Sequence, residues 1–337
     1  MTTLQDAAGT DRPHPQRWRP DPLEGFEHRD LPLTAQPLPG ESLDPLVGTL
    51  IRRSDPELRR SARAVLHVHG WNDYFFHPHV AEFYEAQGYA FYALDLRRYG
   101  RSLRAGQFHG YIDDLDDYRE EIDGAVAAIR REHSHLVLTG HSTGGLITTL
   151  WAGDRPGRID ALVLNSPWLD MWGPVGIGSL MRPIVGPIGK RNPTSPLKMP
   201  EGEEPIYAMA THVDFGGEWN YSLDWKSAGS EVVRLGWVRA ILNGHARVAR
   251  GLPIDCPVLV TISARTAFLR RYSEEARTAD VVLNVDRIAA ASWHLGDAVT
   301  LIRIEGGMHD LSLSLPEPRQ RWFDAVATWL HAYGPSA

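Results

Sequence analysis

Short apolar segments alternate along most of this chain with longer segments whose apolar residues recur every three or four positions. The short segments, such as "AVLHVHG" and "ALVLN", are rich in β-branched residues and predict buried strands. The longer segments, such as "DGAVAAIRREH", predict amphipathic helices. Strands are expected at residues 64–70, 89–96, 135–142, 159–167, 256–263 and 299–307, and helices at residues 77–88, 114–133, 144–153, 285–295 and 318–333.

This alternation determines the expected architecture. Strand–helix–strand connections are right-handed crossovers, so they produce a mostly parallel sheet with helices on both faces. Two earlier strand candidates, residues 26–33 and 48–53, can form an antiparallel edge. Regular patterning stops between Pro167 and Leu252, where Pro, Gly, Trp and Met are dense. We therefore predict a mobile N-terminal stretch (residues 1–20), an α/β core in two parts (residues 21–166 and 253–337) and an inserted cap (residues 167–252).

Composition narrows the class of protein. Of the 337 residues, 43% are hydrophobic and 23% are charged, which fits a globular protein. The net charge of −7 argues against a nucleic-acid partner or a general anionic-membrane binder, because both need a basic face. No apolar run approaches the roughly 18 residues of a membrane span, and the N-terminus lacks the apolar core of a secretory signal. The single cysteine, Cys256, excludes an internal disulfide, so we expect a cytoplasmic location.

The segment "LVLTGHSTGGLIT" carries the pattern G-x-S-x-G between an apolar strand and an apolar helix. In that context the pattern is typical of a nucleophile elbow, a strained turn that exposes a serine above the sheet. Gly140 and Gly144 let the strand and the helix approach without Cβ clashes. Ser142 is therefore the candidate nucleophile, and the alternative is a glycine-rich turn whose serine has no chemical role.

The segment "LHVHGWNDYFFHP" ends the strand at residues 64–70 and contains a His-Gly-Trp sequence. Acyl transfer forms a tetrahedral oxyanion that needs two preorganised N–H donors. We expect the backbone N–H groups of Thr143, directly after the candidate nucleophile, and of Trp71 to supply them. Metal binding is the alternative for the histidines of this segment, which are His67, His69, His77 and His79. No HExxH helix or cysteine cluster accompanies them, so no metal site is predicted.

His309 is the candidate base. It follows the last strand in "IRIEGGMHDLSLS", where Gly306 and Gly307 give the loop freedom to aim the ring across the sheet. A histidine can accept and return a proton near neutral pH. A surface loop histidine is the alternative, but the order of serine, acid and histidine along the chain favours a catalytic role.

Four motifs, "HVHGW", "LDLRRYGRS", "GHSTGG" and "GGMHDL", occur in an order and spacing that resemble α/β-hydrolases of the monoacylglycerol-lipase-like or serine-aminopeptidase-like branch. The resemblance covers the chain from about Val65 to the C-terminus, without the middle. It implies an eight-stranded, mostly parallel sheet with a cap inserted after "ALVLNSP". It also implies that Ser142 acts as nucleophile, that His309 acts as base, and that an Asp or Glu orients the histidine.

The acid departs from the family pattern. The resemblance places it a few residues after the strand "PVLVTIS", but "ARTAFLRRYSEEA" follows there without an aspartate. Asp280, in "ADVVLNV", matches the end of the family loop, so we expect an insertion before it and assign it as the acid. Asp286, Glu274 and Glu275 are the alternative acids, and a helix N-cap is the alternative role for Asp280.

Tryptophan and methionine are frequent in the predicted cap. Ligand pockets are largely apolar, so we expect some of these side chains to contact substrate and the others to pack the cap on the core. The substrate-binding candidates are Trp168, Met171, Trp172 and Trp219. The carboxylates Asp214, Glu218 and Asp224 either belong to a turn of the cap or receive the amine group of a peptide substrate.

The resulting hypothesis is a serine hydrolase that cleaves a small-molecule carboxylic ester with an apolar acyl or aromatic group. Nothing in the sequence calls for a metal, a nucleotide or a flavin. A lactone hydrolase and an aminopeptidase or amidase are alternatives that use the same triad. A non-catalytic α/β-hydrolase-like binding protein is the alternative from another class.

Overall fold

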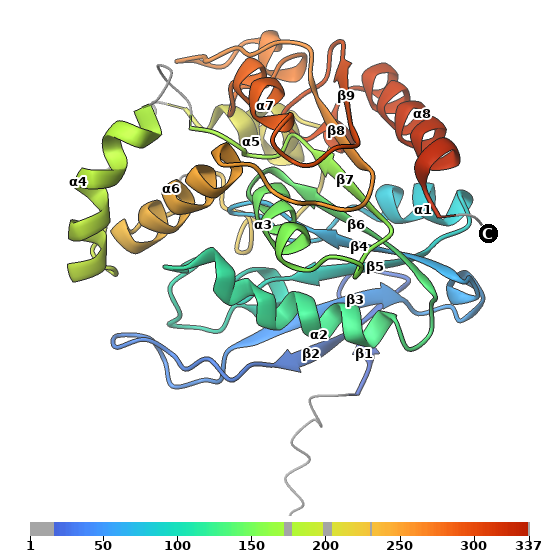
Figure 1. Ribbon diagram of the computed structural model, residues 1–337, viewed down its shortest axis with the longest axis horizontal. Helices are drawn as coiled ribbons and strands as arrows, with labels where there is room; N and C mark the ends of the chain where they lie inside the picture. Colours follow the sequence, from blue (N-terminus) through green and yellow to red (C-terminus); the bar gives the residue numbers. More distant parts are fainter. Residues whose placement is uncertain (1–16, 172–176, 198–203, 230, 336–337) are drawn as a thin grey trace, which may run out of the picture.

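The computed structural model describes residues 17–171, 177–197, 204–229 and 231–335, and it is built on one central sheet (Figure 1). The strands are β1 (Arg19–Pro20), β2 (Phe26–Pro32), β3 (Val47–Arg53), β4 (Arg63–Val68), β5 (Ala90–Asp95), β6 (His135–His141), β7 (Ala161–Asn165), β8 (Val258–Ser263) and β9 (Val299–Ile304). The helices are α1 (Pro78–Ala86), α2 (Arg119–Ile129), α3 (Ser142–Asp154), α4 (Ile177–Arg191), α5 (Ile206–Thr211), α6 (Leu235–Ala249), α7 (Val285–Ser292) and α8 (Pro316–Tyr333).

The strand order is β1-β2-β3-β5-β4-β6-β7-β8-β9. From β5 to β9 all neighbours pair in parallel, and the predicted antiparallel edge is formed by β2 and β3. The sheet has one strand more than the eight expected, because Arg19–Pro20 pairs with β2. A strand of two residues is too short to show a periodic pattern in the sequence, so β1 was not predicted. Its two residues end the stretch predicted to be mobile, of which residues 1–16 lie outside the described residues.

Both faces of the sheet are covered, as a parallel sheet requires. Side chains alternate between the faces along each strand. In β4, Leu66 and Val68 join the core that includes α2, α3 and α6, whereas Val65 joins the core that includes α1 and α8. All three side chains are fully buried. The structure therefore confirms the predicted α/β class.

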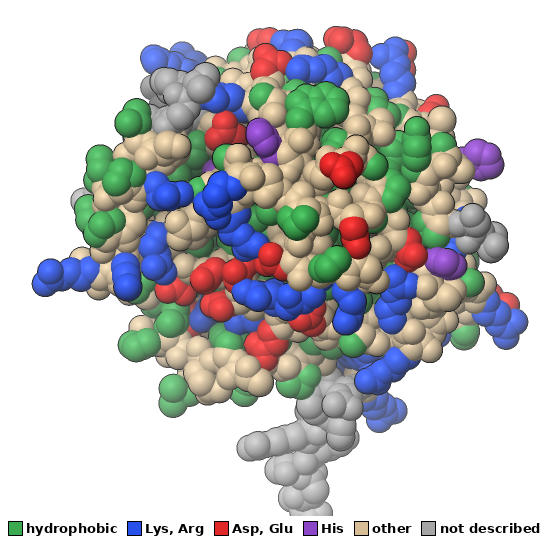
Figure 2. Space-filling view, viewed as in Figure 1, with side chains coloured by type: hydrophobic (Ala, Val, Ile, Leu, Met, Phe, Trp, Pro, Cys, Tyr) green, Lys and Arg blue, Asp and Glu red, His purple; other side chains and the backbone are tan. Residues whose placement is uncertain are grey.

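Residues 167–252, called the cap segment below, connect β7 to β8, and their limits stay a prediction. Helix α6 packs on α3, and α4 packs on α6 (Figure 1). The outward side of α4 carries Leu180, Ile184 and Ile188, which are all exposed. Figure 2 shows hydrophobic side chains on the side of the molecule where Figure 1 places α4. In the described part of the chain, no helix combines the length and the apolar character needed to cross a membrane.

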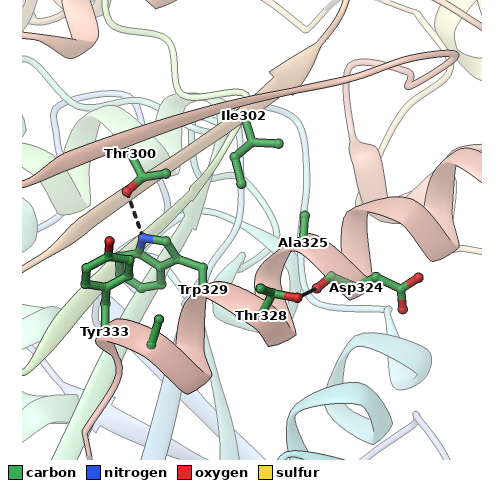
Figure 3. Close-up of a pocket in the computed structure, with 8 residues that line it drawn as sticks. Thr300, Ile302, Asp324, Ala325, Thr328, Trp329 and Tyr333 are labelled. Carbon is green, nitrogen blue, oxygen red and sulfur yellow. Dashed lines mark hydrogen bonds between the residues drawn. The ribbon is translucent and has the colours of Figure 1, made fainter.

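A surface cavity of about 390 Å³ lies between β9 and α8 (Figure 3). The Trp329 indole N–H donates to Thr300 Oγ1 at 3.0 Å and ties the helix to the edge strand. The cavity lining is mostly apolar and includes Ile302, Ala325 and Tyr333. None of the candidate site residues lines this cavity, so we assign it no part in the chemistry.

Arg101 connects the N-terminal part of the chain to the centre of the sheet. Its guanidinium donates to the two oxygens of Asp21 at 2.6 and 2.7 Å and to Asp95 Oδ2 at 2.9 Å. All three side chains are buried. Burial alone would raise the pKa of Asp21, but hydrogen bonds from His28 and Arg101 lower it to about 2. Arg101 thus pairs with two buried carboxylates, and His28 contacts one of them as well.

We expect Arg101→Met to lower the free energy of unfolding by about 3–5 kcal/mol, because it removes the guanidinium from two buried carboxylates and leaves His28, beside Asp21, as the remaining side-chain partner. Urea denaturation monitored by circular dichroism measures the change. Arg60→Met is the matched control: its side chain is 73% exposed, so its loss should cost less than about 1 kcal/mol. Equal effects of the two substitutions would contradict the importance of the buried pair.

Candidate active site

Ser142, His309 and Asp280 form a chain of hydrogen bonds. His309 Nε2 lies 3.0 Å from Ser142 Oγ, and His309 Nδ1 lies 2.8 Å from Asp280 Oδ2. The other carboxylate oxygen accepts the backbone N–H groups of Val282 at 2.8 Å and Leu283 at 2.7 Å. Because the carboxylate can only accept from Nδ1, that nitrogen carries the proton, and Nε2 is free to accept the serine hydroxyl. All three side chains are buried.

Ser142 stands at the junction of β6 and α3 in a strained conformation, with φ at +52°. The turn fits only because glycines flank it. A Cβ atom on Gly144 would lie 2.1 Å from the carbonyl oxygen of His69, and one on Gly140 would lie 2.7 Å from the Gly144 oxygen. The predicted elbow geometry is therefore present, and it places the Ser142 hydroxyl at the N-terminus of a helix.

The loop between β8 and α7 explains why Asp280 is so far from β8 in sequence. The Asp280 N–H donates to Arg265 O at 3.0 Å, and the Ala267 N–H donates to Asp280 O at 2.8 Å. These bonds surround a parallel bridge between Thr266 and Asp280. Residues 268–279 therefore leave the sheet and return to the same place. This is the geometry that an insertion before the acid would produce.

The alternative acids lie elsewhere. The Asp286 side chain is 81% exposed and pairs with an arginine of β9. Glu275 pairs with an arginine of its own loop, and Glu274 accepts a tyrosine hydroxyl. The N-cap of α7 is Asn284, whose side chain accepts two backbone N–H groups, so Asp280 does not have the capping role.

Two hydrogen bonds fix the ring of His69 in the loop after β4. The Leu96 N–H donates to Nε2 at 3.1 Å, so the ring proton lies on Nδ1, which donates to Gly70 O at 2.8 Å. A trans peptide points its C=O and N–H in opposite directions, so the Trp71 N–H points away from this ring. A Cβ on Gly70 would lie 3.2 Å from Ser142 Cβ. The peptide predicted to supply an oxyanion donor therefore lies next to the serine.

A second buried carboxylate, Asp310, follows His309 directly. It accepts the Asn165 amide at 2.8 Å and lies 3.4 Å from His77 Nε2 and 4.0 Å from His141 Nε2. Burial alone would raise the pKa of Asp310, but the histidines and hydrogen bonds hold it well below its usual range. Burial lowers the pKa of His141 to about 4, so this ring is neutral at pH 7. Within the described residues, no group of three or more His, Cys, Asp or Glu side chains could hold a metal ion.

Sequence reasoning missed Asp73 and Lys226. The Lys226 ammonium donates to Asp73 Oδ1 at 2.7 Å, and both side chains are buried. Burial alone would raise the pKa of Asp73, but Lys226 and neighbouring histidines lower it to about 2. The two residues are 153 positions apart, so no local motif could have linked them.

Trp168 lies closest to the chemistry among the substrate-binding candidates. Its backbone N–H donates to Ser142 O at 2.9 Å, and its ring lies 5.8 Å from the ring of Trp237. Its indole Nε1 is buried and has no hydrogen-bond partner among the described residues. Met171 is buried in the main core. Trp172 lies outside the described residues.

Trp219, the last of these candidates, packs on the core. Its ring stacks on His79 with centroids 4.4 Å apart, and its indole N–H donates to a backbone carbonyl of the loop after His309. The three carboxylates of the same part of the cap segment are exposed: Asp214, Glu218 and Asp224. Their exposure agrees with a surface turn.

A parallel sheet whose strand-to-helix turn presents a serine in this way is the α/β-hydrolase fold. The chain belongs to the serine aminopeptidase S33 family, whose model matches residues 59–311.

Individual proteins resemble the chain in sequence or in fold. The chain is 26% identical over 258 residues to a monoacylglycerol lipase of Mycolicibacterium smegmatis, which covers 75% of this chain and 81% of the relative. The crystal structure of monoacylglycerol lipase from Paleococcus ferrophilus superposes with a TM-score of 0.60 at 19% identity, over 80% of this chain and 93% of that one. A soluble variant of monoglyceride lipase from Saccharomyces cerevisiae gives a TM-score of 0.58 at 13% identity, over 89% and 97% of the two chains.

Buried neutral histidines should make the protein sensitive to acid. Burial lowers the pKa of His67 to about 3 and that of His141 to about 4. Between these values and the usual pKa of about 6.5, the unfolded chain binds more protons, so stability is lost as the pH falls below about 6.5. Each histidine accounts for at most about 2 kcal/mol at pH 5.

We therefore expect the melting temperature to fall between pH 7.5 and pH 5, as measured by differential scanning fluorimetry. His67→Gln, which cannot become charged, should reduce the fall. His331→Gln, at an exposed position of α8, should leave it unchanged. A fall of the same size in His67→Gln and in the unmodified protein would contradict the role of His67.

Proposed function

We propose that this protein is a serine hydrolase that cleaves carboxylic esters, with Ser142 as nucleophile, His309 as general base and Asp280 as the acid that orients it. One observation carries the proposal: His309 Nε2 is 3.0 Å from Ser142 Oγ while Nδ1 is 2.8 Å from Asp280 Oδ2. A nucleophile in contact with a base that a third group orients is the arrangement that activates a serine. The similarity to monoacylglycerol lipases supports esters as the substrates.

The reaction begins when Ser142 Oγ attacks the ester carbonyl carbon and His309 Nε2 takes the hydroxyl proton. The tetrahedral intermediate collapses, and the leaving alcohol receives that proton from His309. An acyl group then remains on Ser142. Water attacks the acyl carbon while His309 accepts a proton, and collapse of the second intermediate frees the carboxylic acid and returns the proton to Ser142. Asp280 holds the imidazole in orientation and stabilises its charged form throughout.

We assign the oxyanion of both intermediates to the backbone N–H groups of Trp71 and Thr143. Thr143 is the second residue of α3, and the first N–H groups of a helix have no partner within the helix. The direction of the Trp71 N–H follows from the hydrogen bond between His69 and Gly70. Each such donor is worth about 3 kcal/mol of transition-state stabilisation.

An ester with an apolar acyl or aromatic group suits the cap segment best. Trp168 lies beside the nucleophile and packs near Trp237, which gives an apolar wall with one unpaired indole N–H. A lactone would react by the same steps. An aminopeptidase finds less support, because the three carboxylates considered for binding an amine, Asp214, Glu218 and Asp224, are all exposed.

A fluorophosphonate probe should label Ser142, because the probe reacts only with a serine that an adjacent base activates. Intact-mass and peptide mass spectrometry would locate the label. Ser142→Ala should abolish labelling and lower the hydrolysis of p-nitrophenyl esters by at least about 10³-fold. Ser179→Ala, at an exposed position of α4, should change neither. An unmodified protein that is folded but not labelled would favour a non-catalytic binding protein.

Asp280→Asn should lower kcat/KM for p-nitrophenyl esters by about 10³–10⁴-fold, because the Nδ1–H of His309 would lose its acceptor and the tautomer would change. Asp286→Asn is the matched control and should stay within about twofold, because that carboxylate is exposed. Full activity of Asp280→Asn together with an inactive Ser142→Ala would show that the acid is assigned wrongly and that the nucleophile is not.

A further inference from the structure

We propose that Lys226 is a positioning residue that holds the loop after β4 in place through Asp73 and thereby fixes the Trp71 N–H as an oxyanion donor. The inference rests on the proposed ester hydrolase function and gives the cap segment a role in catalysis besides binding substrate. In this role the cap segment completes the oxyanion site, and the reaction requires that the cap segment is packed against the loop after β4.

The contact is an ion pair sealed from water. Lys226 Nζ lies 2.7 Å from Asp73 Oδ1, and the two side chains are 6% and 2% exposed. The second oxygen, Asp73 Oδ2, accepts the Gly70 N–H in a long hydrogen bond of 3.4 Å. One oxygen of the carboxylate therefore binds the cap segment, and the other binds the His69–Gly70 peptide, one peptide before the Trp71 N–H.

The residues on either side of Asp73 also form hydrogen bonds with the cap segment. The Asn72 side chain donates to Ser227 O at 3.0 Å and accepts the Ser227 N–H at 3.0 Å. The Tyr74 hydroxyl accepts the Ser222 N–H at 2.7 Å. Asn72 has φ at +49°, in the left-handed region that most side chains avoid and asparagine tolerates, and the contacts with Ser227 help to hold it there. The cap segment thus holds three consecutive loop residues.

The surroundings of Lys226 make the ion pair obligatory. The ammonium lies 5.3 Å from the ring centroids of Phe76 and Tyr207 and 5.5 Å from that of Tyr221. Aromatic faces attract a cation only modestly, and Asp73 is its salt-bridge partner. A buried ammonium without a partner is strongly disfavoured, so we expect Lys226 to occupy this site only together with the Asp73 carboxylate.

The consequence for catalysis lies at Gly70. Its carbonyl accepts the proton of His69 Nδ1 from the core side, and its N–H donates to Asp73 from the cap side. The Gly70 N–H belongs to the His69–Gly70 peptide and the carbonyl to the Gly70–Trp71 peptide, so the two bonds hold the peptides on both sides of Gly70 and set the direction of the Trp71 N–H. A donor that is preorganised before the charge develops is what stabilises an oxyanion. Loss of the ion pair should therefore weaken binding of the transition state more than binding of the ester.

Two double variants test this without leaving a buried charge unpaired. Asp73→Leu with Lys226→Met removes the tether, whereas Asp73→Asn with Lys226→Gln keeps a neutral hydrogen-bonding pair. Glu218→Gln is the control, because it removes an exposed contact between the cap segment and Arg319 of α8. Three quantities are measured: the rate of fluorophosphonate labelling, the affinity for a trifluoromethyl ketone, and amide hydrogen exchange in the peptide covering residues 69–76. Melting temperatures report whether each variant is folded.

In the Leu/Met variant we expect labelling and ketone affinity to fall in parallel by about 10–100-fold, with KM for p-nitrophenyl butyrate within about threefold and faster exchange in the loop peptide. The Asn/Gln variant should retain most of the labelling rate and most of the ketone affinity. Glu218→Gln should match the unmodified protein. If the Leu/Met variant does not fold, Asp73→Asn with Lys226→Met takes its place, because it lacks the tether but keeps a side-chain oxygen near Gly70.

Equal ketone affinities and equal loop exchange in the two double variants would overturn the proposal, because the pair would then only stabilise the fold. A loss of ketone affinity accompanied by an equal rise in KM would also overturn it. Failure of the proposed function looks different. In that case the unmodified protein is folded but not labelled, and the exchange of the loop peptide still decides whether Lys226 positions the loop.

Discussion

The candidate site depends on one close approach, that of the turn between β6 and α3 to the end of β4. The backbone at Gly144 lies so near the carbonyl of His69 that a single methyl group would not fit. This contact brings Ser142 against Gly70 and forces the serine into a conformation that side chains disfavour. The carboxyl ends of parallel strands meet at one edge of the sheet. The loops after β8 and β9 therefore reach the same place and bring Asp280 and His309 to the serine.

Around that contact the protein buries three carboxylates, and each has a different kind of partner. Asp280 is held by backbone N–H groups and His309. Asp310 is held by an amide and two histidines, and Asp73 by Lys226. An unpaired carboxylate at any of these positions would cost several kcal/mol. The network therefore leaves few alternative arrangements for the side chains of the candidate site.

What the sequence predicts well is local. The β-branched runs and the glycines around Ser142 reveal the parallel sheet and the elbow, because both depend on neighbours in the chain. The acid could be assigned to Asp280 only by its match to the end of the family loop, with three other carboxylates as alternatives, because the bridge that returns Asp280 to the end of β8 joins residues on either side of an irregular loop. The ion pair of Asp73 and Lys226 could not be predicted from the sequence at all. Neither residue belongs to a periodic pattern, and their contact exists only once the cap segment has folded onto the core.

The closed loop of residues 268–279 bears on two properties of the protein: the position of the Asp280 carboxylate and the shape of the surface beside it. Its ends are fastened to each other at Ala267 and Asp280, so these backbone bonds help to hold the Asp280 backbone whatever the number of residues between them. Loop length costs little free energy once the ends are joined. The exposed residues of this stretch can therefore change and give the surface beside the candidate site a new shape or charge, whereas Ala276, which is buried in one cluster with Met308, limits what can replace the part that packs beside His309.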